Sequence, residues 1–143
     1  MNLSKNFTLE ELCTTNVSLP NLPDQQEIRS LQFLVKNILQ PLRELYGKPI
    51  KINSGFRSLA VNKSVGGVST SQHTKGEAAD ISCDDNAKLF KLIKDKFVFD
   101  QLIWEGGNDF QPSWVHISYK SAGNRNQKLK MVKINGKSTY VNT

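Results

Sequence analysis

Histidine is scarce in this sequence, and its scarcity limits where metal chemistry can take place. The 143 residues contain two histidines, His73 and His116, and two cysteines, Cys13 and Cys83. Neither cysteine lies in a CxxC pair, so we expect reduced, buried thiols and no cysteine-based zinc site. A metal site in this chain must therefore be built around one or both histidines.

Long apolar runs are also missing. No stretch approaches the roughly 20 apolar residues that cross a bilayer, so we expect no membrane span. The first six residues lack the apolar core of a signal peptide, which predicts synthesis in the cytoplasm. A composition of 38% hydrophobic and 22% charged residues excludes general disorder, and 143 residues predict one domain, which we expect to be a monomer.

Acidic residues are absent from the C-terminal part of the chain. Residues 120–143 contain six basic side chains and no acid, whereas the remaining chain holds 13 of each sign. We interpret residues 121–143 as a basic C-terminal hairpin extension of a single domain 1–143, because Asn135-Gly136 lies between two alternating runs. A basic surface suits a wall polymer, an anionic membrane or nucleic acid, and it also serves solubility alone. We expect no stable nucleic-acid partner, since Tyr119 and Tyr140 are the only evident stacking residues there.

Periodicity predicts helices in the first part of the chain and strands in the later part. The expected helices are 7–13, 25–46 with a kink or division at Pro41, and 85–96. The expected strands are 48–53, 80–83, 99–105, 113–119, 131–134 and 137–141, and residues 59–70 are expected to form a polar loop. This order predicts an α+β domain with a central antiparallel sheet and helices packed mainly on one side.

The segment Ser71–Asp80 contains the most informative pattern. It places His73 and Asp80 seven residues apart, with Gly76 and two alanines between them to allow a tight turn. With His116 they would supply three zinc ligands and leave a position for water, whose pKa zinc would lower to about 7. An iron(II) oxygenase uses similar ligands, but it usually presents His-x-Asp, so we rank it below zinc.

Two further side chains have suitable chemistry. Arg57 follows a predicted strand on a glycine turn, where its guanidinium can bind a carboxylate through two parallel hydrogen bonds. A catalytic site also needs a carboxylate that accepts the proton of the attacking water. If the strands 99–105 and 113–119 pair as a hairpin, Glu105 falls opposite Ser113 or Trp114. Pairing with Trp114 would put Glu105 on the same face as His116, because alternate residues share a face. We therefore predict Glu105 as the base, with Asp109 as a weaker candidate.

Three motifs resemble the zinc D-Ala-D-Ala carboxypeptidases and the L-alanyl-D-glutamate endopeptidases of phage endolysins, within the wider group of LAS peptidases. The motifs are Ser54-Gly55-Phe56-Arg57-Ser58, the segment Ser71–Asp80 and Trp114-Val115-His116. The resemblance spans roughly residues 7–120. It implies zinc bound by His73, Asp80 and His116, Arg57 stabilising the transition state or recognising substrate, and Ser71 lining the substrate cleft.

The chain departs from the family at Ser113, where better-known members carry the catalytic acid. This departure is why Glu105 is our candidate. We predict a zinc peptidase that cleaves peptidoglycan stem peptides at a bond involving D-amino acids, with Arg57, Ser71 and Trp114 as substrate-binding residues. We expect it to act on the cell wall, as a phage lysin or a bacterial enzyme does. The alternative is a non-catalytic, zinc-containing module that binds the wall or belongs to a phage structure.

Overall fold

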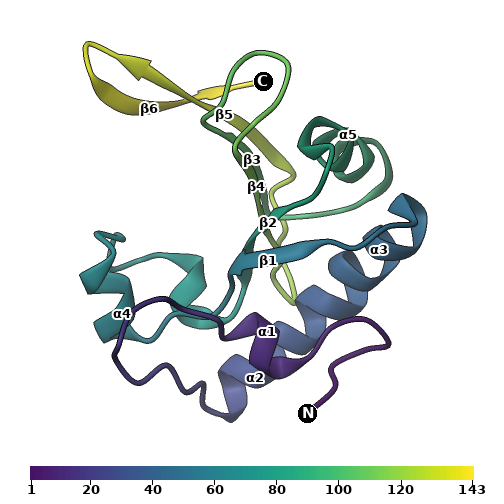
Figure 1. Ribbon diagram of the computed structural model, residues 1–143, viewed down its shortest axis with the longest axis vertical. Helices are drawn as coiled ribbons and strands as arrows, with labels where there is room; N and C mark the ends of the chain where they lie inside the picture. Colours follow the sequence, from purple (N-terminus) through teal and green to yellow (C-terminus); the bar gives the residue numbers. More distant parts are fainter.

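A six-stranded sheet forms the centre of the computed structural model, which describes residues 1–143 (Figure 1). The strand order across the sheet is β1-β2-β4-β3-β5-β6. The strands are β1 (Lys51–Ser54), β2 (Ala78–Ser82), β3 (Gln101–Glu105), β4 (Trp114–Ser118), β5 (Gln127–Ile134) and β6 (Lys137–Asn142). The α+β prediction is confirmed, and β5 and β6 form the predicted hairpin around Asn135-Gly136.

The sheet is mixed, which corrects the prediction of an antiparallel sheet. Four of its five strand pairs are antiparallel, but β3 and β5 run parallel. The reason lies in the connection 119–126. β4 is antiparallel to β3, so it ends beside the start of β3. The connection passes around that end of β3 and enters β5 on the other side of β3, so β5 runs in the same direction as β3.

Buried Asp100 holds this connection in place. Its carboxylate accepts hydrogen bonds from the backbone N–H of Arg125 at 3.1 Å and from the guanidinium at 2.9 and 2.7 Å. Burial raises the pKa of Asp100, but the hydrogen bonds and charge of Arg125 outweigh it and lower the pKa below its usual value. The carboxylate is therefore ionised and paired, as a buried charge must be.

One face of the sheet is covered by helices. These are α1 (Leu9–Leu12), α2 (Gln25–Leu34), α3 (Gln40–Tyr46) and α5 (Asn86–Lys96), and with the sheet they enclose a core of 21 buried apolar residues. Thr8 and Asp24 cap α1 and α2, each with a capping box. The π-helical segment η1 (Val35–Leu39) separates α2 from α3 directly before Pro41, which confirms the predicted interruption. A proline ring clashes with the carbonyl four residues earlier, and a wider turn relieves that clash.

The opposite face carries shorter elements. Residues 59–70 are not entirely a loop as expected, because α4 (Leu59–Ser64) occupies their first half. The hydroxyl of Ser58 caps this helix by accepting from the Val61 N–H, and burial of Val61 and Asn62 stabilises it. A 3-10 helix, η2 (Gln72–Lys75), follows and leads into β2. Figure 1 shows α4 and the β5–β6 hairpin projecting on the same side of the sheet.

Two expectations came from what the sequence has little of, long apolar runs and cysteine, and both can be compared with the structure. No helix combines the length and the apolar character that crossing a membrane requires. Cys13 and Cys83 are unpaired and half-buried rather than fully buried. Burial and the nearby charge of Glu10 raise the pKa of Cys13 to about 11, so this thiol is protonated at neutral pH.

Candidate metal centre and active-site cleft

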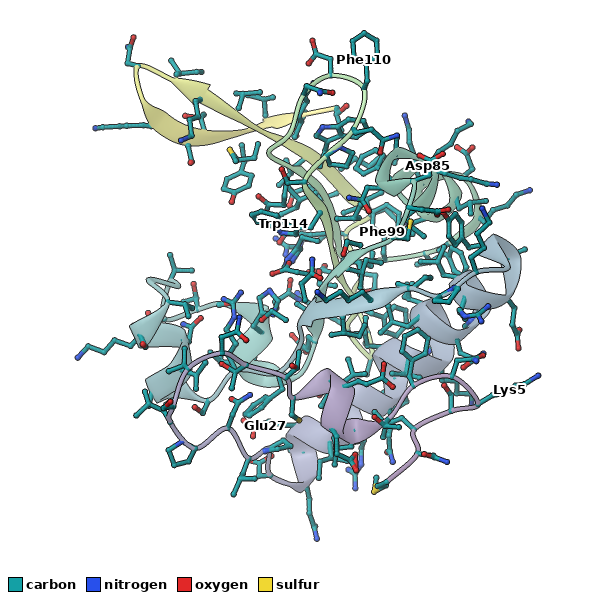
Figure 2. All side chains as sticks on the ribbon, in the orientation of Figure 1. Lys5, Glu27, Asp85, Phe99, Phe110 and Trp114 are labelled. Atoms are coloured by element: carbon teal, nitrogen blue, oxygen red, sulfur yellow. The ribbon has the colours of Figure 1, made fainter.

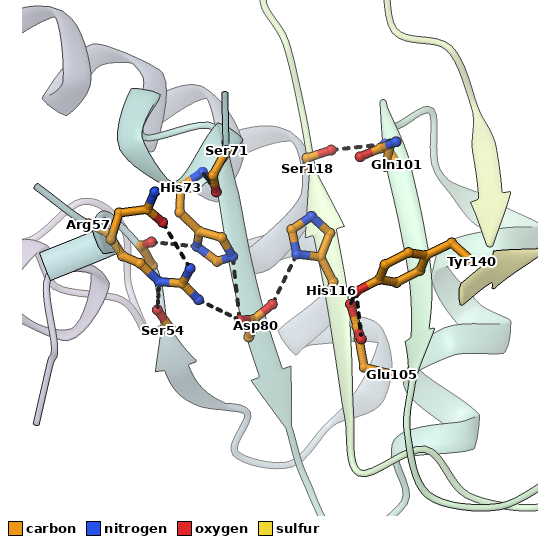
Figure 3. A network of polar contacts seen from close by, with 12 residues as sticks. Ser54, Arg57, Ser71, His73, Asp80, Gln101, Glu105, His116, Ser118 and Tyr140 are labelled. Carbon is orange, nitrogen blue, oxygen red and sulfur yellow. Dashed lines mark hydrogen bonds and ion pairs between the residues drawn. The ribbon is translucent and has the colours of Figure 1, made fainter. Parts of the chain in front are cut away.

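The three predicted metal ligands meet on the side of the sheet that faces the hairpin and α4. Figure 3 shows His73, Asp80 and His116 converging, and their ligand atoms all lie within 4.8 Å of one another. His73 and Asp80 are buried, with 4% and 8% of their surface exposed. Side chains separated by up to 43 positions in the sequence thus form one compact donor set.

Strand register brings Asp80 and His116 together. Asp80 on β2 lies directly opposite His116 on β4, so both side chains project from the same face. The Nδ1 atom of His116 is 3.0 Å from Oδ1 of Asp80. Neighbouring Val115 and Ile117 point to the other face and are fully buried in the core. The alternation of this strand therefore holds one ligand in the site by anchoring its neighbours beneath the sheet.

His73 is held by backbone groups from a different part of the chain. Its Nδ1 lies 2.7 Å from the carbonyl oxygen of Gly55, which can only accept, so Nδ1 carries the proton. The other ring nitrogen, Nε2, faces Asp80 and lies 3.4 Å from Oδ2. This arrangement fixes the tautomer, as a hydrogen bond behind a metal-binding histidine commonly does.

Gly55 can occupy this position only because it has no side chain. A Cβ there would lie 2.3 Å from the backbone oxygen of Leu12, whose carbonyl accepts a hydrogen bond from the N–H of Phe56. The end of α1 therefore packs directly against the turn that orients His73. The predicted tight turn after His73 is also present, with Gly76 in the left-handed conformation at φ 73°.

Asp80 is ionised at this site. Burial raises the pKa of its carboxyl group, but the hydrogen bonds and charges of His116 and His73 outweigh burial and hold the pKa well below the usual range. Arg57 adds a third contact, with Nη2 3.4 Å from Oδ2 of Asp80. A deprotonated carboxylate is the form that binds a metal ion.

Arg57 is fixed at the edge of the metal site rather than free on the surface. Its Nε donates to the hydroxyl of Ser54 at 3.0 Å, and Nη1 donates to the side-chain oxygen of Asn62 at 3.3 Å. The side chain is 18% exposed and lines the same cleft as the histidines. The guanidinium is thus oriented before any substrate arrives, as an electrostatic role requires.

Glu105 lies in the register that its proposed role requires. It pairs with Trp114 across β3 and β4, so it shares the face of His116, and it is 7% exposed. Burial raises the pKa of Glu105; the charge of His116 lowers it, the charge of Asp80 raises it, and a hydrogen bond from Tyr140 lowers it, with a net upward shift. A carboxyl group with a raised pKa in a polar cleft is typical of a proton-transferring residue.

The neighbouring alternatives for the base lie elsewhere. Asp109 is 85% exposed, is paired with Lys130 at 2.5 Å, and does not line the cleft. Ser113, where the family resemblance implies an acid, directly precedes β4 and donates its N–H to the carbonyl of Glu105 at 2.9 Å. The candidate base of this chain, Glu105, thus lies on β3, the strand that pairs with β4, and not at position 113.

A cleft of about 610 Å³ surrounds these groups. It is lined by all three predicted substrate-binding residues, Arg57, Ser71 and Trp114. In Figure 2 Trp114 faces the open side while Phe99 lies toward the helices. Residues from the C-terminal segment, Arg125, Leu129 and Tyr140, complete the lining. The sequence analysis did not identify these three as site residues. For Tyr140 the one indication was the alternation of side chains along the predicted strand 137–141.

The donor set suits zinc. Two imidazole nitrogens and one carboxylate are borderline ligands that zinc accepts readily. The cluster contains three donors, the number typical of catalytic zinc sites, whereas structural sites usually supply four. His73, Asp80 and His116 would hold the ion.

Comparison with known proteins points the same way. The zinc D-Ala-D-Ala carboxypeptidase of Streptomyces albus G is 52% identical over 44 residues, which is 30% of this chain and 17% of that protein. The chain therefore matches only a small part of that relative's length. The family model for Peptidase M15 matches residues 5–118, a span that includes the three metal-site residues, Arg57 and Glu105. On this match the chain belongs to the Peptidase M15 family.

Proposed function

We propose that this protein is a zinc peptidase that hydrolyses peptidoglycan stem peptides at a bond involving D-amino acids. The observation that carries the proposal is the cluster His73, Asp80 and His116, within 4.8 Å, in one cleft with the buried carboxylate of Glu105. Membership of Peptidase M15 supports hydrolysis of a peptide bond, and the name of the Streptomyces relative supports a D-alanine-containing substrate.

Each residue of the cleft has its own role in hydrolysis. A bound zinc ion would activate water and polarise the carbonyl under attack. Glu105 takes the proton of the attacking water and passes it to the leaving amine, a transfer favoured by its raised pKa. Arg57, held by Ser54 and Asn62, stabilises the negative charge that develops on the carbonyl oxygen. Ser71 and Trp114, which also line the cleft, contact the peptide.

Two features support an enzyme over a non-catalytic zinc module. A purely structural site would be expected to have a fourth protein ligand, and this cluster has three. It would also have no need for a buried carboxylate and an oriented arginine in the same cleft, because burying such groups costs free energy. We propose that the protein acts on the cell wall, where such peptides occur.

The test is digestion of purified peptidoglycan. Protein stripped of metal with a chelator is compared with the same protein after addition of zinc, and soluble fragments are analysed by mass. We expect fragments only with zinc, and their masses distinguish loss of a terminal D-alanine from cleavage within the stem. Asp80→Asn is expected to lower both zinc content and fragment release, whereas Asp109→Asn, outside the cleft, leaves both unchanged. Zinc-loaded protein that binds the wall but releases no fragment would identify a non-catalytic module.

A further inference from the structure

The C-terminal hairpin brings a tyrosine to the proposed base. Tyr140 lies on β6 opposite Met131 of β5, and it lines the cleft together with Glu105. The family match ends at residue 118, so the hairpin is outside the stretch that defines the family. Figure 3 shows the Tyr140 ring reaching across the sheet face with its hydroxyl beside the Glu105 carboxylate.

The contact involves both oxygens of the carboxylate. The Tyr140 hydroxyl is 3.4 Å from Oε1 and 3.5 Å from Oε2 of Glu105. It is the one hydrogen-bond donor that the carboxylate has from the protein, although Glu105 is only 7% exposed. A buried carboxylate with a single donor depends on that donor for its orientation, since its other contacts are not directional.

The backbone position of Glu105 does not fix its carboxylate. Pairing with Trp114 determines the face from which the side chain projects, but a glutamate keeps three rotatable bonds beyond its Cα. Tyr140 reaches from two strands away, because β5 lies between β3 and β6 in the sheet. Its ring is rigid beyond two torsions, so the hydroxyl is a well-defined anchor.

We propose that Tyr140 is a positioning residue that holds the Glu105 carboxylate in the orientation needed for proton transfer. The inference rests on the proposed function, in which Glu105 is the base. It assigns a role in the reaction to the C-terminal hairpin, which would otherwise be only a basic extension.

The experiment is a double-mutant cycle with Tyr140→Phe and Glu105→Gln on the zinc-loaded protein. Release of free amino groups from purified peptidoglycan is followed. We expect Tyr140→Phe to lower kcat about tenfold with KM unchanged, the lower end for a hydrogen bond to a charged group. In the Glu105→Gln background the same change should have less than a twofold effect, because the group it positions is gone. Tyr119→Phe, which removes a hydroxyl outside the cleft, is the matched control and should leave kcat unchanged.

The outcomes separate the two proposals. If wild-type protein is active and Tyr140→Phe equals it, Tyr140 does not position Glu105, and the proposed function stands. If Glu105→Gln keeps full activity, the assignment of the base fails and the positioning role fails with it. If wild-type protein releases nothing, the proposed function fails. The unfolding free energies of the same four metal-free proteins, measured in urea, then test whether Tyr140 and Glu105 interact. Non-additive unfolding free energies support it, and additive values overturn it.

Discussion

Glu105 and Trp114 face each other across the β3–β4 pair, and this register places the Glu105 carboxylate on the side of the sheet that carries His116. A shift of one residue would turn Glu105 into the core and leave the metal site without a base. The chemistry of the site therefore depends on the pairing of two five-residue strands.

Replacement of the base should separate catalysis from metal binding. Glu105→Gln keeps the size of the side chain but cannot accept a proton, so we expect hydrolysis of peptidoglycan to fall by about 10²–10⁴-fold. Zinc content, measured by mass spectrometry of the metal, should equal that of wild type, because Glu105 is not in the donor cluster. Glu44→Gln, on the exposed surface of α3, is the control. Undiminished hydrolysis by Glu105→Gln would show that another group takes the proton.

Arginine geometry at position 57 should matter beyond charge. Arg57→Lys keeps the positive charge but loses the planar fork that contacts Ser54, Asn62 and Asp80 together. We expect kcat to fall by about 10–100-fold with zinc content unchanged. This is less than the roughly 10²–10³-fold loss on removing a preorganised donor, because the positive charge remains. Arg29→Lys, an exposed substitution on α2, should have no effect. Equal activity of the two variants would indicate that Arg57 supplies charge alone.

A methyl group at position 55 should displace the backbone carbonyl that orients His73. Gly55→Ala places a Cβ 2.3 Å from the Leu12 oxygen, so the turn carrying the His73 partner must move. We expect a loss of about 1–3 kcal/mol in unfolding free energy, as for other overpacked sites, and weaker zinc binding. The measurements are urea unfolding and competitive zinc titration.

The control for Gly55→Ala is Gly123→Ala. Gly123 has open space around it and a φ of 76°, so alanine there meets only the left-handed backbone cost of about 1–2 kcal/mol. Zinc affinity should be unchanged in this variant. A wild-type zinc affinity in Gly55→Ala would mean that the Gly55 carbonyl does not orient His73.

Asp100 should make stability depend on acid pH. Its pKa is lower in the folded protein than in the unfolded chain, so its contribution is complete above the unfolded value of about 3.9. That contribution is lost as the pH falls through the lower folded-state pKa. We expect Asp100→Asn to cost about 1–2 kcal/mol at pH 7, a modest value because half of the Arg125 side chain is exposed. The difference from wild type should shrink as unfolding is measured at successively lower pH, and a constant difference would contradict the assignment.

The sequence predicted which three side chains would come together, because the patterns that contain them are local. His73 and Asp80 lie within one ten-residue segment, and His116 lies in a strand whose alternation is plain. The expected hairpin placed Glu105 opposite Ser113 or Trp114, because the connection limits the possible pairings, and the structure shows the pairing with Trp114.

Features that depend on distant contacts could not be read in this way. The helix α4 has only six residues, too few to show a helical pattern, and it is stabilised by the Ser58 cap and by burial of Val61. The parallel pairing of β5 depends on the Asp100–Arg125 contact, which no local pattern shows. Because that pairing carries the hairpin to the cleft, Tyr140 was also missed as a site residue.

The strand order has a consequence for how this enzyme type can diversify. Asp80 and His116 of the candidate metal site lie on β2 and β4 in the interior of the sheet, whereas Tyr140 lies on β6, its outermost strand. An outermost strand can change in length or sequence without altering the pairing of β2 with β4. The edge hairpin can therefore be exchanged as a module that adapts the cleft to a new peptide while the metal chemistry is inherited intact.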